Sequence, residues 1–117
     1  MIALLAIFAF VAVAARVAYA KPGCHSRACS TRVWHHHQRL IVRANAGWLA
    51  RVRRCESGGN YRTNTGNGFY GAYQFDISSW RGAGGVGMPN TASRLEQDYR
   101  ALVWRQRAGV GAWPVCG

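Results

Sequence analysis

The stretch Cys55-Glu56-Ser57-Gly58-Gly59-Asn60 decides the fold prediction, because a glutamate there follows a cysteine and precedes two glycines. Apolar residues upstream recur at helical spacing, and they are Trp48, Leu49, Val52 and Cys55. A glycine pair is a typical helix stop, so the pattern predicts a helix that ends just after Glu56. Glu56 is therefore expected where a helix opens into a loop.

Glu56 is one of only four acidic residues in a chain of 117. Aromatic rings near a helix end can partly desolvate a carboxyl group, which raises its pKa and keeps it protonated near neutral pH. A glutamate held in that way can serve as a general acid. The alternative is a solvated glutamate that forms an ordinary surface ion pair with Arg53 or Arg54.

A glycine-rich and aromatic segment follows the glutamate. Asn64-Thr65-Gly66-Asn67-Gly68 tolerates positive φ, and Phe69-Tyr70-Gly71-Ala72-Tyr73-Gln74-Phe75 comes directly after it. This composition predicts a short β-hairpin. Strict alternation would place Tyr70, Ala72 and Gln74 on one face and Phe69, Tyr73 and Phe75 on the other.

The remaining acids are expected mainly in structural positions. Asp76 precedes a short apolar segment and can cap the first turn of a helix. Ser93-Arg94-Leu95-Glu96 is a capping box before a helix predicted at residues 94–107. Its inward positions are Leu95, Tyr99, Leu102 and Val103. Asp98 lies in the first turns of that helix, where the dipole favours an acid. Glu56 and Asp76 remain as candidates for chemistry.

An acid followed by aromatic rings and amides is what cleavage of a sugar chain requires. Glycoside hydrolysis normally uses two carboxylates, one as proton donor and one as nucleophile or base. Asp76 is the only available second carboxylate. If Asp76 only caps a helix, Glu56 works alone, and a hydroxyl or acetamido group of the substrate attacks in place of a second protein group.

The amino-terminal region reads as a leader followed by a basic arm. Residues 2–15 are almost entirely apolar, and Ala18-Tyr19-Ala20 fits the small-residue rule for signal-peptide cleavage. We therefore expect a signal peptide at residues 1–20, with an uncleaved anchor as the alternative. Residues 21–45 form a basic linker or arm in which a short helix is conceivable at residues 34–44, and residues 46–117 form one compact domain.

The charge and the cysteines are consistent with an exported protein. The chain has 15 Lys and Arg against 4 Asp and Glu, a formal net charge of +11, which suggests a polyanionic partner.

The four cysteines are Cys24, Cys29, Cys55 and Cys116, and export favours disulfides in any of three pairings. Zinc is the competing interpretation, with four histidines nearby, but no C-x-x-C pair exists. We expect neither a metal nor a cofactor.

Several motifs, in order and at matching spacing over residues 46–117, resemble the resuscitation-promoting factor family, a transglycosylase-like domain of Gram-positive bacteria. They are Cys55-Glu56-Ser57-Gly58-Gly59-Asn60, Asn64-Thr65-Gly66-Asn67-Gly68-Phe69-Tyr70-Gly71, Gln74-Phe75, Trp80 and Gly111-Ala112-Trp113-Pro114-Val115-Cys116. The resemblance implies an α+β, lysozyme-like domain that is mostly helical with a short β-hairpin. It also implies cleavage of peptidoglycan glycan strands, Glu56 as the catalytic acid and a disulfide between Cys55 and Cys116.

The resemblance further implies a set of substrate-binding residues, namely Asn60, Tyr70, Tyr73, Gln74, Asp76, Ser79 and Trp113. The expected partners are peptidoglycan glycan strands, anionic cell-wall polymers and a wall-hydrolase partner protein. We expect no nucleic acid partner, a monomer, and a location outside the cell or in the cell wall. The alternative functions are a wall-binding or growth-signalling module with little turnover, and a cationic protein that acts on membranes or nucleic acid without needing the acid.

The chain departs from the usual family pattern at three places. Tyr61 replaces a tryptophan, and Tyr73 replaces a leucine, valine or similar residue. Ala108-Gly109-Val110 stands where the family usually has Gln-Gly-Trp. Loss of that amide and that large ring predicts weaker substrate binding or slower cleavage, while the acid itself is retained.

Overall fold

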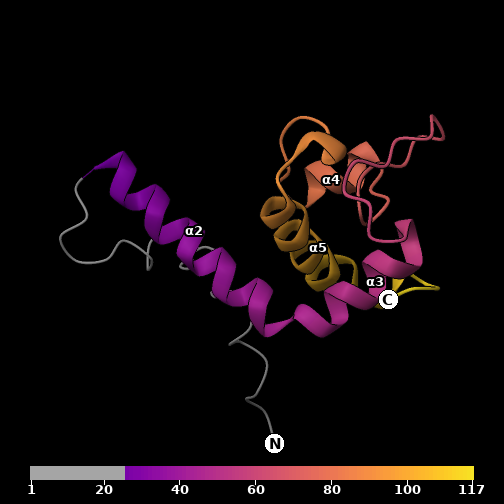
Figure 1. Ribbon diagram of the computed structural model, residues 1–117, viewed down its shortest axis with the longest axis horizontal. Coiled ribbons are helices and arrows are strands. Elements are labelled where there is room, and N and C mark those ends of the chain that lie inside the picture. Colours follow the sequence, from indigo (N-terminus) through magenta and orange to yellow (C-terminus); the bar gives the residue numbers. More distant parts are fainter. Residues whose placement is uncertain (1–25) are drawn as a thin grey trace, which may run out of the picture. The chain divides into compact units, whose positions relative to one another are not determined.

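The computed structural model describes residues 26–117, so the signal peptide predicted at 1–20 and the cysteine at position 24 lie outside the described residues. The chain divides into two units, residues 1–37 and 38–117. Four α-helices are described, α2 (Arg27–Ala44), α3 (Ala46–Ser57), α4 (Ile77–Gly82) and α5 (Arg94–Ala108) (Figure 1). Two short 3₁₀ helices, η1 (Pro89–Thr91) and η2 (Gly109–Ala112), precede and follow α5.

Helix α2 covers most of the segment predicted as a basic arm, and it is longer than the helix expected at residues 34–44. Gln38, the first residue of the second unit, is completely buried, and its amide donates a hydrogen bond to Glu96 Oε2 at 3.2 Å. Within the described residues, no helix has the length and apolar character that a membrane span requires.

The predicted β-hairpin is wrong. The described residues contain no β-strand, and residues 60–75 form turns with two isolated bridges, Asn64 with Tyr70 and Tyr70 with Phe75. Gly71 and Gln74 have positive φ angles of 74° and 50°, which turn the chain too sharply for an extended strand. The predicted alternation of faces fails for the same reason, since the neighbours Ala72 and Tyr73 are both fully buried.

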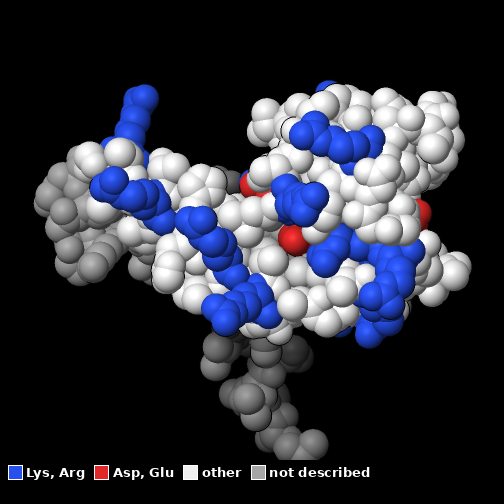
Figure 2. Space-filling model, in the orientation of Figure 1, with Lys and Arg blue, Asp and Glu red and all other residues white. Residues whose placement is uncertain are grey.

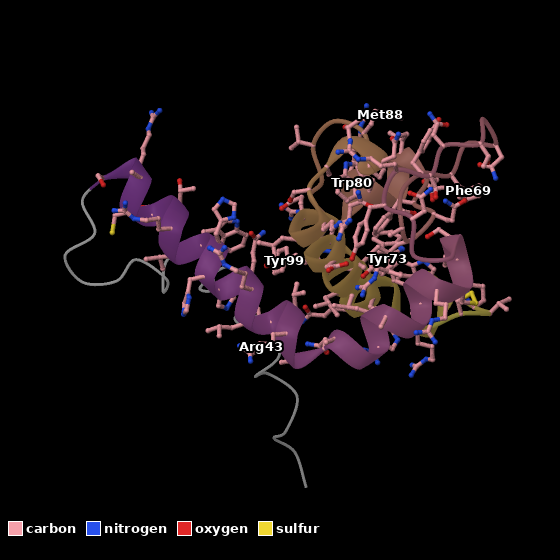
Figure 3. The ribbon with its side chains drawn as sticks, in the orientation of Figure 1. Arg43, Phe69, Tyr73, Trp80, Met88 and Tyr99 are labelled. Atoms are coloured by element: carbon pink, nitrogen blue, oxygen red, sulfur yellow. A yellow bond between two sulfur atoms is a disulfide. The ribbon has the colours of Figure 1, made fainter. Side chains whose placement is uncertain are left out.

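The core of the second unit is built from aromatic rings and small apolar side chains. Its buried members are Leu49, Val52, Ala72, Tyr73, Phe75, Trp80, Ala101 and Trp113. Phe75 packs against the edges of Trp80 and Trp113, with ring centroids 5.4 and 5.6 Å apart. Figure 3 shows Tyr73 and Trp80 inside the domain and Phe69, which is 46% exposed, on the outer loop. The core therefore fixes the loop of residues 60–75 against α3.

The starts of α4 and α5 agree with the sequence. Asp76 caps α4 by accepting from the Ser79 amide, and Ser93 caps α5 by accepting from the Glu96 amide. The buried face of α5 differs from the prediction: its four expected inward residues are only half-buried, whereas Gln97, Asp98 and Ala101 are buried. Two polar side chains thus face the core.

Gln97 uses its buried amide to hold the loop in place. Its Oε1 accepts from the Ala72 amide at 3.0 Å, and its Nε2 donates to the carbonyls of Tyr61 and Ala92, both at 3.1 Å. A Cβ atom at Gly71 would clash with that same Oε1. Glycine is therefore required at position 71 both for its left-handed backbone and for this close contact.

Candidate functional site

Glu56 lies in the last turn of α3, as the sequence predicts. The helix ends at Ser57, and Gly58 follows in the left-handed conformation with φ of 65°. The amides of Gly58 and Gly59 donate to the carbonyls of Arg54 and Arg53, at 3.1 and 3.0 Å. These bonds satisfy two of the carbonyls that a helix end leaves open. The glycine pair therefore fixes where the helix stops and where the Glu56 side chain emerges.

The Glu56 carboxyl group is half-buried and has no partner. Within residues 26–117 it forms no hydrogen bond and no ion pair, in contrast to the surface pairing with Arg53 or Arg54 that was the alternative. Burial raises its pKa above the ordinary value of 4.5, because a partly desolvated carboxyl group resists ionisation. This is the direction that a general acid requires.

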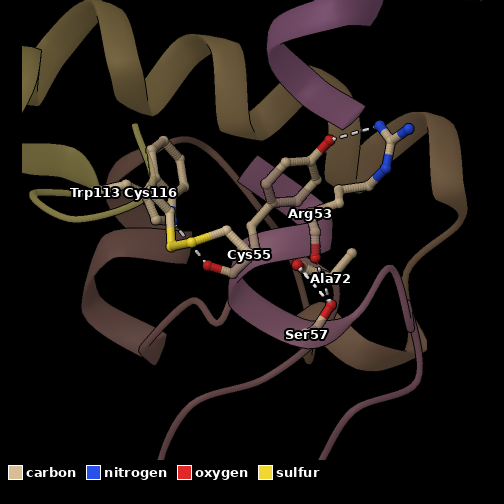
Figure 4. Close-up of a disulfide and its surroundings, with 7 residues drawn as sticks. Arg53, Cys55, Ser57, Ala72, Trp113 and Cys116 are labelled. Atoms are coloured by element: carbon tan, nitrogen blue, oxygen red, sulfur yellow. Dashed lines mark hydrogen bonds between the residues drawn. A yellow bond between two sulfur atoms is a disulfide. The ribbon is translucent and has the colours of Figure 1, made fainter. Parts of the chain in front are cut away.

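Three contacts hold the end of α3 in position (Figure 4). Cys55 is bonded to Cys116, as the resemblance implies, and this disulfide closes a sequence separation of 61 residues. The hydroxyl of Ser57 donates to the Ala72 carbonyl at 2.8 Å and lies 3.2 Å from the Arg53 carbonyl. The residues on both sides of Glu56 are thus tied to the carboxyl terminus and to the loop.

A buried cluster around Asp98 was not expected from the sequence. One oxygen of Asp98, Oδ1, accepts from the Tyr73 hydroxyl at 2.6 Å, the Tyr61 hydroxyl at 2.7 Å and the Arg53 guanidinium at 3.0 Å. Burial and then the hydrogen bond to Asp98 raise the pKa of Tyr73 and of Tyr61 far above the usual range. Arg53 belongs to α3, so this cluster also connects the helix that carries Glu56 to α5.

Two departures from the family pattern thus meet at one carboxylate. Tyr61 and Tyr73, two residues at which the sequence departs from the usual pattern, each donate a hydroxyl hydrogen bond to Asp98. The sequence did contain a signal for this cluster. The hydroxyl groups of Tyr61 and Tyr73 require acceptors if they are buried, and the chain has only four acids. Because Asp98 lies far from both tyrosines along the chain, the sequence did not indicate which acid accepts these hydrogen bonds.

Two predicted substrate contacts, Tyr73 and Trp113, belong to the core. Tyr73 is fully buried, and Trp113 is 6% exposed. The Trp113 indole donates to the Tyr73 carbonyl at 2.9 Å, so the two residues support each other. Their burial argues against the predicted contact of these rings with a sugar, because the hydroxyl and the indole N–H are already used inside the domain.

The other predicted contacts lie near the surface. Asp76 and Ser79 bind each other, with Asp76 Oδ1 2.9 Å from the Ser79 amide and Oδ2 2.6 Å from its hydroxyl. Burial acts to raise the pKa of Asp76, but these Ser79 hydrogen bonds outweigh it and lower the pKa below its ordinary value. The pKa of Asp76 is therefore shifted in the opposite direction from that of Glu56, as suits a helix cap.

Gln74, Tyr70 and Asn60 come from the turns before α4. Gln74 is half-buried and donates its amide to the Gly71 carbonyl at 3.0 Å, and Tyr70 is half-buried between its two bridges. Asn60 is exposed, and its Oδ1 accepts from the Arg62 amide at 2.9 Å. These three residues have solvent-accessible surface, so contact with a substrate remains a prediction for them.

The described cysteines and histidines do not form a metal centre. Within residues 26–117 there is no group of three His, Cys, Asp or Glu side chains that could hold an ion. Two members of the zinc set considered from the sequence, at positions 24 and 25, lie outside the described residues.

Comparison with known proteins matches residues 43–116 to the model of the transglycosylase-like domain. The chain is 52% identical over 66 residues to resuscitation-promoting factor Rpf of Micrococcus luteus, a match that covers 56% of this chain and 30% of that protein. It is 46% identical over 76 residues to resuscitation-promoting factor RpfE of Mycobacterium tuberculosis, covering 65% of this chain and 44% of the relative. For RpfC of the same species the values are 50% over 66 residues, 56% and 47%.

These matches confirm the resemblance drawn from the motifs. The family match falls on the region that contains α3, the disulfide and α5. The chain spans less than half the length of each of these three relatives.

Proposed function

We propose that this chain, which belongs to the transglycosylase-like domain family, cleaves the glycan strands of peptidoglycan with Glu56 as the proton donor. The observation that carries the proposal is the state of Glu56. It is the carboxyl group whose pKa is raised by burial, and it has no partner among the described residues. The match to the transglycosylase-like domain supports a glycan as the substrate class.

In the proposed reaction, Glu56 protonates the glycosidic oxygen as the bond between two sugars breaks. The positive charge that develops at the anomeric carbon must then be captured by a nucleophile. Asp76 is poorly suited to this role, since both of its carboxylate oxygens are engaged by Ser79. We therefore propose that Glu56 acts alone and takes a proton back from the attacking group, which is either water or a hydroxyl of the same sugar.

The proposed site of action is outside the cell. The expected signal peptide at residues 1–20 and the excess of basic side chains support export to an anionic cell wall. Figure 2 shows this excess on the displayed face, where arginine side chains greatly outnumber acidic ones.

A second candidate function is a wall-binding or growth-signalling module with little turnover. The burial of Tyr73 and Trp113 favours it, because two rings expected to stack on sugars lie in the core. The two candidates differ in whether covalent bonds of the glycan are broken.

Mass spectrometry of purified peptidoglycan after incubation with the protein tests the proposal. We expect new soluble fragments, and their masses identify the nucleophile, since hydrolysed ends are one water heavier than anhydro ends. The matched control is Glu56→Gln, which keeps the shape of the side chain and removes the acidic proton. Absence of new fragments with the folded wild-type protein would leave only the wall-binding function.

A further inference from the structure

Two hollows border α3, one on its outer side and one beside the end of α5 and the carboxyl-terminal residues. Each has a volume of about 430 Å³. The first is lined by Gly47, Ala50, Arg51, Arg54 and Cys55. The second is lined by Trp48, Arg51, Arg105, Gly109, Trp113, Pro114 and Gly117. Arg51 lines both hollows, so they are neighbours, and we call the two together the α3 basic surface.

The first hollow of the α3 basic surface and Glu56 lie on opposite faces of α3. Leu49, Val52 and Glu56 follow each other at spacings of three and four residues, which places the acid in line with the core-facing side. Gly47, Arg51 and Arg54 follow each other at spacings of four and three residues on the other side. A ligand on this surface would therefore leave the acid free.

Arginine side chains dominate the charge of this surface. No Asp or Glu side chain lines either hollow. Within residues 26–117, Arg51 and Arg54 form no hydrogen bond and no ion pair, and both are exposed. The Arg105 guanidinium lies over the Trp48 ring, 4.4 Å from its centroid. Three guanidinium groups thus border the two hollows taken together, and their mutual repulsion favours an anionic ligand.

We propose that the α3 basic surface binds a linear phosphodiester polymer of the cell wall, in which phosphates alternate with sugars or polyols. Guanidinium groups bind phosphate oxygens with paired hydrogen bonds, and several of them in a row suit a repeating anion. This function is additional to cleavage, and it does not depend on Glu56.

The rings of the second hollow argue against single-stranded nucleic acid as the ligand. Binding of single-stranded nucleic acid uses aromatic faces on which bases stack. Here Arg105 covers a face of Trp48, and Trp113 is only 6% exposed. Recognition by charge alone, without stacking, is the mode that these side chains offer.

Gly47 provides a substitution that tests the surface without harming the fold. A Cβ at this position would meet nothing within 4 Å, so a side chain there would extend into the first hollow. Gly47 is the second residue of α3, where an acidic side chain is favoured by the helix dipole and glycine is a poor helix former. Gly47→Glu should therefore stabilise α3 while it places a negative charge beside Arg51.

The experiment measures binding of the full chain to poly(glycerol phosphate) by titration calorimetry at several salt concentrations. We expect Gly47→Glu and Arg51→Gln each to weaken binding by about tenfold or more, which corresponds to loss of one charge-assisted contact. Arg62→Gln is the matched control, because Arg62 is exposed and lies outside both hollows. It should retain wild-type affinity within about twofold, and Glu56→Gln should bind as the wild type does.

Polyglutamate and single-stranded DNA of equal charge serve as competing probes. Tighter binding of poly(glycerol phosphate) than of either, with loss in Gly47→Glu and Arg51→Gln only, is the expected result. Equal losses in Arg62→Gln would show that only net charge matters and would overturn the proposal. Preferred binding of DNA or polyglutamate through Arg51 would also overturn it, by assigning the surface to another ligand.

Discussion

Helices α3 and α5 each contain a carboxyl group at least partly buried in the domain, and the two groups differ in their hydrogen-bond donors. Asp98 of α5 is buried and accepts three hydrogen bonds on one oxygen, two from tyrosines and one from Arg53. Glu56 of α3 is half-buried, and no described residue donates to it. The pKa of Glu56 is raised by burial for this reason, since nothing stabilises its charged form.

The difference separates a structural acid from a reactive one. A carboxylate with three donors is fixed, and removing it would leave buried donors without acceptors. A desolvated carboxyl group without donors contributes little to folding, but burial raises its pKa, which is the direction that proton donation requires. Arg53 lies one turn before Glu56 on α3 and forms an ion pair with Asp98. The structural acid therefore helps to position the helix that contains the reactive one.

The largest expected effect on stability is that of Asp98→Ala. It leaves two tyrosine hydroxyls and the Arg53 guanidinium without their acceptor, and we expect a loss of about 3 to 5 kcal/mol in the free energy of unfolding. Glu96→Ala is the matched control on the same helix. Glu96 forms an i,i+4 pair with Arg100 at 2.6 Å and accepts from the buried Gln38 amide, so its loss should cost about 1 to 2 kcal/mol, less than the loss of Asp98. Chemical denaturation measures both, and similar losses would refute the contrast.

Removal of the disulfide comes next. Replacing Cys55 and Cys116 by alanine should lower the free energy of unfolding by about 2 to 4 kcal/mol, because the bridge constrains a long loop of the unfolded chain. Activity should fall as well, since Cys55 precedes Glu56. Thermal unfolding of the reduced and oxidised protein checks the value. An unchanged melting temperature would show that the core alone holds the end of α3.

Glu56→Gln should change stability with the opposite sign from Asp98→Ala. Folding raises the pKa of Glu56 above its unfolded value of about 4.5. The wild-type protein therefore loses stability as the pH rises from this unfolded pKa through the higher folded pKa. The glutamine variant lacks this loss. We therefore expect it to be at least as stable as the wild type at pH 7 and to lose its advantage below pH 4. A variant less stable at pH 7 would indicate a stabilising partner for Glu56.

The smallest expected effect is that of Asp76→Asn. Asparagine caps a helix about as well as aspartate, so the free energy of unfolding at pH 7 should change by less than about 1 kcal/mol. Since the folded pKa of Asp76 is lowered, the wild type keeps its cap above the ordinary value of 3.8 and loses it as the pH falls through the folded value. Wall-fragment release should stay measurable. A loss of release as large as that of Glu56→Gln would make Asp76 a second catalytic carboxylate.

The parts of the fold that depend on neighbouring residues were predictable from the sequence. The end of α3 follows from its glycine pair, and the starts of α4 and α5 follow from Asp76 and Ser93. Each of these signals acts over three or four residues, which is why a local pattern identifies it. The family also followed from the order and spacing of short motifs.

The parts that depend on distant contacts were not predictable in this way. The loop of residues 60–75 has the composition of a hairpin, but Gln97, 25 positions beyond Ala72, binds its backbone and favours a turn at Gly71. The acceptor of the Tyr61 and Tyr73 hydroxyls, Asp98, lies 37 and 25 residues away. Composition indicates that such groups need partners, and only the fold determines which partners they find.

The most direct test compares wall-fragment release by Glu56→Gln and Asp98→Asn under conditions in which both variants are shown to be folded. Loss of a general acid costs roughly 10²- to 10⁴-fold in rate, so Glu56→Gln should lose nearly all release while Asp98→Asn retains more than about a tenth of it. Release by Glu56→Gln at close to the wild-type rate would contradict the assignment of Glu56 as the proton donor.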